Sequence, residues 1–336
     1  MTAVGTLTAA VEPGEPITER VLDWIGGPRW LWILLWAAIS LVRPLILLLS
    51  LTASDQSPDA AGWINVLLPQ AALGYVTLVS LVGTARIFHG ARALASDLAT
   101  IAKLEQRTTF FPWMASVTGP VALLLLVSAI SFLAGVQKWG PVSGIADLPL
   151  LLANTLPITV FVWTYLALLA GINALGRFRL ALDPFPQDRS LGLGPVGSLA
   201  LTGFWLVLAA AIPLIVVTAD NVATVAMSLA VVGVSTALFF LSMFRLHRQM
   251  GEAKARYLKL TRDIYGDAWA PVRLKPTLKA LQGQGPVLAV AQALVDRAER
   301  VQEWPIDERA TAWVAVVVTG VVTSLIVRLV LVAAGA

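Results

Sequence analysis

Seven apolar stretches, each long enough to cross the hydrocarbon of a bilayer, constrain this chain more than any other feature. A membrane-spanning helix needs about 20 mostly apolar residues. The stretches cover residues 30–51, 64–84, 113–136, 148–172, 198–217, 222–244 and 311–334. Only 13% of the 336 residues are charged and 57% are hydrophobic, whereas soluble domains carry about 25% charged residues. The sequence therefore predicts an all-α, polytopic integral membrane protein with seven transmembrane helices.

The distribution of basic residues predicts the orientation of these helices. If the N-terminal tail and the even-numbered connections share one side, that side holds 21 of the 24 arginines and lysines, and the opposite side holds only Lys138. The positive-inside rule then predicts a cytoplasmic N-terminus and a C-terminus outside. The same rule explains the net charge of +4 without a nucleic-acid partner. Arginine-rich, Ala/Leu/Val-rich composition favours a bacterial inner membrane as the location.

Four parts are expected along the chain. Residues 1–29 form a cytoplasmic tail, 30–244 a six-helix transmembrane region, 245–310 a cytoplasmic helical connection, and 311–336 the seventh transmembrane helix. Within the connection, 245–265 is expected to extend the sixth helix, and a Pro- and Gly-punctuated stretch follows. Apolar residues then recur at helical spacing: Val287, Val290, Ala291, Leu294, Val295, Ala298 and Val301. These two helices are predicted to pack as an antiparallel pair.

Residues that carry enzyme or metal chemistry are scarce. The chain has no cysteine and only two histidines, and every aspartate and glutamate lies outside the spans. Metal sites need clustered His, Cys or carboxylate ligands, and ion-coupled carriers use carboxylates within the membrane. We therefore expect no cofactor, no metal ion and no catalytic residues, and the protein is not expected to be an enzyme.

Two arginines enter the spans and are candidates for solute binding. At ~1.5 Å per helical residue, Arg43 lies ~20 Å beyond Trp30 and Arg328 ~25 Å beyond Thr311, which places both in the outer half of the membrane. A charge at this depth is a functional hypothesis by default. Both side chains could line an anion-attracting vestibule or bind lipid phosphates; alternatively, Arg328 reaches the outer interface.

The seventh span also carries a stripe of small and hydroxylated residues. Gly320, Ser324 and Arg328 are spaced by four, and Thr319 and Thr323 lie beside them, so all five share one face of a helix. Such a stripe can line a hydrated pore. It is also typical of close packing between helices.

Two short motifs flank the fifth and seventh spans: D-P-F-P-Q-D-R-S-L-G-L-G-P-V-G at 183–197 and E-W-P-I-D at 303–307. In the first, Asp188, Arg189, Gly192 and Gly194 are candidates for an anion-binding nest or a gate at the cytoplasmic mouth. The alternative is a turn between two helices, because Gly and Pro clusters commonly punctuate loops.

Together, the two motifs resemble those of a group of bacterial multi-pass membrane proteins. In that group the loop typically reads H-P-D-R-A-G-G-L-G, and the last span follows an E-W-P-F-D-like segment. Here Pro186-Gln187 replaces His-Pro and Leu191 replaces a glycine. The resemblance implies a multi-pass membrane protein and no particular chemistry. The arrangement of seven spans is also similar in topology to insect-chemoreceptor-type channels, in which the last helix lines the pore of a tetramer.

Three functions remain open. The first is channel-like or receptor-like conduction with the last helix near the pore, in a possible homo-oligomer. The second is a non-conducting scaffold or sensor that binds a partner through 245–310. The third is a facilitator of a small anionic solute. The lipid bilayer is the one partner that all three require.

Overall fold

The computed structural model describes residues 15–26, 28–53, 60–101, 111–139, 141–178, 180, 182, 189–218, 222–274 and 276–334. This described part of the chain contains helices and no strand, which confirms the all-α class for these residues. Its helices are α2 (Ile17–Ile25), α3 (Arg29–Ala53), α4 (Ala60–Ile101), the 3₁₀ turn η1 (Pro112–Ala115), α5 (Thr118–Trp139), α6 (Pro141–Leu175), α7 (Gly194–Thr218), α8 (Val222–Leu274), α9 (Leu278–Glu299) and α10 (Glu308–Ala333).

Several of these helices are suited to a membrane. Five contain segments long and apolar enough to cross one: Leu67–Ala95, Leu151–Leu175, Gly194–Val217, the apolar part of Val222–Leu274, and Glu308–Ala333. The described residues of α3 and α5 give shorter apolar windows, Trp30–Ile39 and Thr118–Leu133. The third apolar stretch begins in η1, and its helix starts five residues later than expected, at Thr118.

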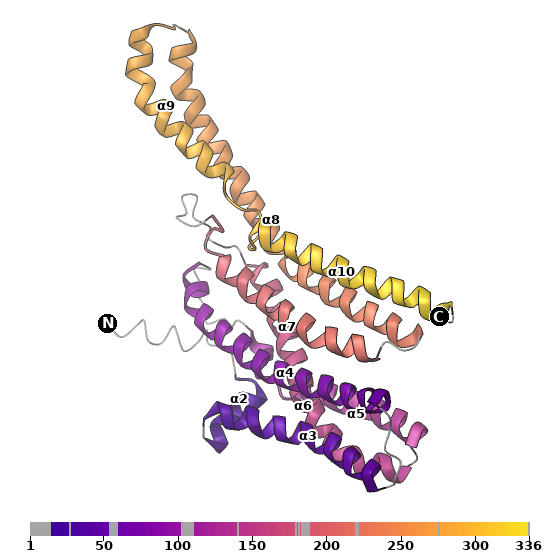
Figure 1. The fold of residues 1–336 in the computed structure, drawn as a ribbon. Helices are drawn as coiled ribbons and strands as arrows, with labels where there is room; N and C mark the ends of the chain where they lie inside the picture. Colours follow the sequence, from indigo (N-terminus) through magenta and orange to yellow (C-terminus); the bar gives the residue numbers. More distant parts are fainter. Residues whose placement is uncertain are drawn as a thin grey trace.

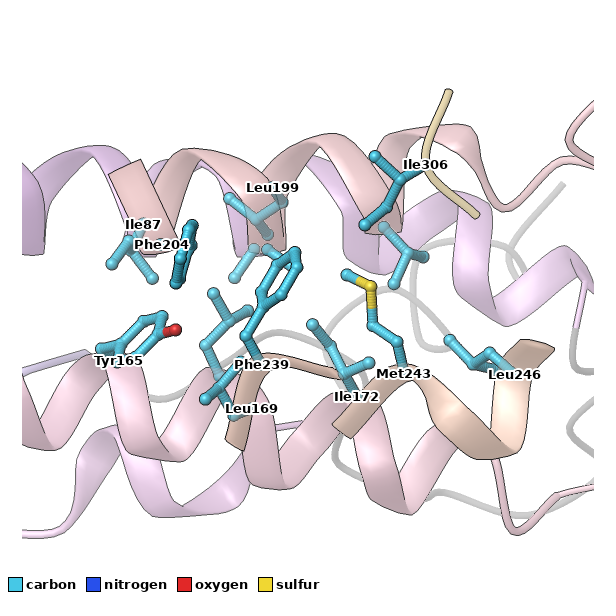
Figure 2. Close-up of a cluster of buried hydrophobic side chains, with 14 of the residues drawn as sticks. Ile87, Tyr165, Leu169, Ile172, Leu199, Phe204, Phe239, Met243, Leu246 and Ile306 are labelled. Carbon is cyan, nitrogen blue, oxygen red and sulfur yellow. The ribbon is translucent and has the colours of Figure 1, made fainter. Parts of the chain in front are cut away.

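Helices α4, α6, α7 and the first half of α8 surround the core (Figure 1). Side chains from all four meet there, and Ile306 enters from the segment before α10 (Figure 2). Phe204 of α7 and Phe239 of α8 lie with ring centroids 4.8 Å apart, a contact worth about 1 kcal/mol beyond simple burial. The segment before α10 is therefore part of the core packing and not only a connection.

The second half of α8 leaves the bundle and pairs with α9 in a long antiparallel hairpin (Figure 1). The expected extension of the sixth helix and the expected helical pair are both present. The expected break is much shorter than the sequence indicates, because Gly266 and Pro271 lie within α8, and Gly283 and Pro286 within α9. Packing between the two helices, with Ala268 and Val272 buried on α8, outweighs the weak helix propensity of these residues.

The apolar face expected on α9 also needs a correction. Ala291, Ala298 and Val301 are buried, as the helical spacing predicts, but Val287 and Val290 are 49% and 62% exposed. These two residues lie near the middle of α9.

Candidate functional site: the last helix and the segment before it

The polar stripe of α10 faces away from the rest of the chain. The opposite face packs on α8 and the core, with Val314 and Leu325 buried and Val317, Val318, Val321 and Leu329 partly buried. The five stripe residues are all exposed: Thr319, Gly320, Thr323, Ser324 and Arg328. Within the described part of the chain, no helix packs on the stripe.

The middle of the stripe is open. A Cβ atom added to Gly320 would meet no atom within 4 Å. The Ser324 hydroxyl donates to the Gly320 carbonyl, 2.8 Å away on the preceding turn, so its oxygen can still accept a hydrogen bond from an outside group. A glycine notch bordered by hydroxyls can accept either a second helix or water.

Of the two arginines in the spans, only Arg328 has a side chain that the structure describes. Arg328 is exposed and lies near the C-terminal end of α10, where its long side chain can reach the interface. The backbone of Arg43 belongs to α3, but its side chain lies outside the described part of the structure. No contact between the two arginines is therefore described.

The loop before α7 is a capped turn. Leu191 and Gly192 both adopt left-handed backbone angles, with φ of 56° and 82°, and the Ser190 hydroxyl accepts a hydrogen bond from the Gly194 amide at 3.0 Å. A left-handed φ suits glycine better than leucine. Here Leu191 is buried, which offsets the backbone cost. Asp188 lies outside the described residues.

This loop and the E-W-P-I-D segment lie against each other, although more than 100 residues separate them. The Gln302 amide donates to the Arg189 carbonyl at 2.9 Å. Gly197, in the first turn of α7, lies so close to Pro305 that an added Cβ would be 1.9 Å from the Pro305 carbonyl oxygen. The two motifs that the sequence analysis singled out thus form one contact, which we call the α7–α10 junction (residues 189–197 and 301–307).

Helix α8 forms the third side of this junction. The Trp304 ring stacks on His247 with centroids 4.2 Å apart, and Phe240 meets Trp304 edge-on. His247 Nδ1 lies 2.8 Å from the Glu303 carbonyl oxygen, and Lys254 Nζ lies 3.3 Å from the Glu303 carboxylate. The contacts fix the segment at the point where the hairpin ends and α10 begins. The described loop residues form a turn between helices, and the anion-binding nest stays a prediction.

Two groups of residues escaped the sequence analysis. The first lines a cavity of about 960 Å³ beside α6 and α8, and includes four arginines: Arg177, Arg245, Arg248 and Arg256. All four are exposed, so they form a solvated basic surface. The second is Glu19 with His89, in a cavity of about 340 Å³ between α2, α3, α4 and α6. The amphipathic pattern of 17–25 was the signal for a packed helix at this place.

Potential metal ligands are scattered over the described residues. No three His, Cys, Asp or Glu side chains come together among them in a way that could hold a metal ion. The stripe on α10 offers hydroxyls, an open glycine notch and one guanidinium, which suit contact with water, ions or a second helix. Comparisons with protein-family models, with curated proteins and with solved structures found no match to this chain.

Proposed function

We propose that the chain crosses a bacterial inner membrane seven times, through α3, α4, α5, α6, α7, the first half of α8, and α10. Its N-terminus and the α8–α9 hairpin would lie in the cytoplasm and its C-terminus outside. The distribution of basic residues supports this orientation, since the hairpin, the loop before α7 and the end of α4 carry most of them. The apolar lengths of the helices support the membrane location.

We further propose that the protein is a homo-oligomer that conducts ions, with α10 next to the conduction path. The observation that carries this proposal is the outward position of the polar stripe. Residues facing lipid tails are normally apolar, because hydroxyls and exposed glycine backbone gain nothing there. The same residues are stabilised when they face water or the α10 helix of a second copy of the chain. An oligomer in which α10 faces a shared axis supplies both the water and the second copy.

Flux through the purified protein in liposomes tests this proposal. We expect Thr323→Leu combined with Ser324→Leu to lower ion flux by about tenfold or more, because two isobutyl groups would narrow the path and expel water from it. The flux of potassium and of chloride, each followed with an ion-selective dye, gives the measurement.

The matched control is Ala315→Leu, which adds the same side chain to an exposed position of α10 about two turns before Thr323 and outside the stripe. Its flux is expected to equal that of the wild type. Equal flux in the double variant, or no flux in the wild-type protein, contradicts conduction along α10.

The hairpin favours a second candidate, a non-conducting scaffold. Several of its apolar side chains are exposed: Leu274 and Leu278 at the tip, at 81% and 74%, and Val290 near the middle of α9, at 62%. Exposed apolar surface away from lipid indicates a contact with protein. Two results together would favour this function over conduction. The wild-type protein would conduct no ions, and its oligomer would dissociate in the double variant Leu274→Ser, Leu278→Ser.

A further inference from the structure

The cavity beneath α2 combines an apolar wall with one buried charge. Its apolar lining includes Ile17 and Leu22 of α2, Trp32 and Trp36 of α3, Leu81 of α4 and Leu156 of α6. Its polar lining consists of Thr18, Glu19, Arg86 and His89. A volume of about 340 Å³ is within the range of small-molecule sites.

Helix α2 is held in position over this cavity from its other side. The Arg20 guanidinium donates to the carbonyl of Ala115, at the end of η1, and to the carbonyl of Glu15 at 3.0 Å. Thr18 and Glu19, the neighbours of Arg20, line the cavity. One wall of the cavity is therefore a helix that is anchored to the end of η1.

The charged groups of the cavity differ sharply in exposure. The Glu19 side chain is 4% exposed and the His89 side chain 43% exposed, with Glu19 Oε2 and His89 Nε2 3.7 Å apart. Arg86 is exposed. Electrostatic attraction is stronger where water is excluded. A ligand cation next to Glu19 thus gains more than a ligand anion next to Arg86.

Two further features favour a cation. Trp32 and Trp36 both line the cavity, and tryptophan is the side chain whose ring face attracts an ammonium group most strongly. The Thr18 hydroxyl oxygen is buried and has no hydrogen-bond partner among the described residues, so it can accept a bond from an N–H or a polarised C–H group of a ligand. Buried polar atoms in proteins usually form a hydrogen bond, and a bound ligand would provide one for this oxygen.

The geometry points to a binding site for an amphipathic cation, in which an ammonium group lies beside Glu19 and an apolar body lies against Trp32, Trp36 and Leu156. The ammonium could belong to a soluble amine or to the headgroup of a lipid. The site is separate from α10, and the inference does not depend on conduction.

Calorimetric titration of the full-length protein in nanodiscs with benzyltrimethylammonium tests the site. Benzenesulfonate, of similar size and opposite charge, is the matched ligand. We expect the cation to bind at least about tenfold more tightly than the anion. We expect Glu19→Gln to weaken cation binding by about tenfold or more, whereas Asp23→Asn, an exposed carboxylate of the same helix that does not line the cavity, leaves it unchanged.

Two further variants keep the test decisive if Glu19→Gln folds poorly. Trp36→Leu is expected to weaken cation binding about threefold or more, because it removes one ring face. Arg86→Gln is expected to leave cation binding unchanged or stronger. Preferential binding of benzenesulfonate, or weaker cation binding in Arg86→Gln with full binding in Trp36→Leu, overturns the inference.

Native mass spectrometry of the protein in a maltoside detergent distinguishes the two sources of the ammonium group. A retained aminophospholipid that Glu19→Gln loses identifies a lipid headgroup as the occupant. Benzyltrimethylammonium binding without any retained lipid identifies a soluble amine. A lipid retained equally by the wild type and by Glu19→Gln, together with equal affinity of both proteins for benzyltrimethylammonium, contradicts the site.

Discussion

Replacing Gly197 with alanine is expected to lower the thermal unfolding midpoint of the purified protein by about 6 °C or more. The new Cβ would lie 1.9 Å from the Pro305 carbonyl oxygen and 2.5 Å from the Pro305 carbonyl carbon. Both atoms belong to the backbone and cannot rotate away, so α7 and the 301–307 segment must separate. Overpacking in a core costs about 3 kcal/mol in severe cases, and 1 kcal/mol corresponds to about 2 °C in a chain of this size.

Gly233→Ala is the matched control for this change. Gly233 lies in α8, and an added Cβ would meet nothing within 4 Å. Since alanine favours a helix over glycine by about 1 kcal/mol, the control is expected to unfold at the same temperature as the wild type or slightly higher. A Gly197→Ala protein that unfolds together with this control would show that α7 and Pro305 are not in close contact.

Replacing Trp304 with alanine is expected to release the 301–307 segment while leaving the helices in place. The change removes the stacked contact with His247 and the edge-on contact with Phe240. Deleting a large, partly buried aromatic side chain costs about 3 kcal/mol. We therefore expect the Gln302 amide, which donates to the Arg189 carbonyl, to exchange with solvent about 100-fold faster by local opening.

Hydrogen exchange read by mass spectrometry on peptides covering 300–308 gives this measurement. Trp313→Ala is the control, because Trp313 lies on α10 and is 65% exposed. In this control variant, hydrogen exchange of peptides covering 300–308 is expected to equal that of the wild type. Equal exchange in the two variants would mean that the aromatic contacts do not hold the junction.

The α7–α10 junction gives the hairpin a direct mechanical connection to α10. The segment after α9 enters the core through Ile306 (Figure 2). Helix α10 begins two residues later, at Glu308. Eight non-helical residues, 300–307, join the two helices, and contacts with α7 and α8 hold part of this segment in place. In the proposed channel, this connection would let a contact made by the hairpin change the position of the stripe.

Much of the fold follows from local features of the sequence. Apolar stretches of about 20 residues form helices because the backbone must satisfy its own hydrogen bonds in lipid, and the α9 face was readable from the spacing of Ala291 and Ala298. The Pro- and Gly-rich stretch was expected to be a long break, but most of it is helical because α8 and α9 stabilise each other by contacts across the hairpin. Local helix propensity does not report such contacts.

The candidate site was predictable only in part. The spacing of Gly320, Ser324 and Arg328 places them on one face of a helix, but only the packing of α10 on α8 shows that the face points outward. The contact between Gly197 and Pro305 joins residues more than 100 positions apart, which no local pattern reveals. Glu19 was assigned to a cytoplasmic tail, because the amphipathic pattern of 17–25 was not interpreted as a packed helix.

Labelling of single cysteines tests the proposed threading of the chain most directly. The natural chain has no cysteine, so Ala334→Cys and Gln282→Cys each introduce one reactive thiol at an exposed position, the first after α10 and the second on the hairpin. We expect a membrane-impermeant maleimide to label Ala334→Cys in intact spheroplasts and to label Gln282→Cys only after lysis. Labelling of Gln282→Cys in intact spheroplasts, with Ala334→Cys protected until lysis, would contradict the proposed orientation.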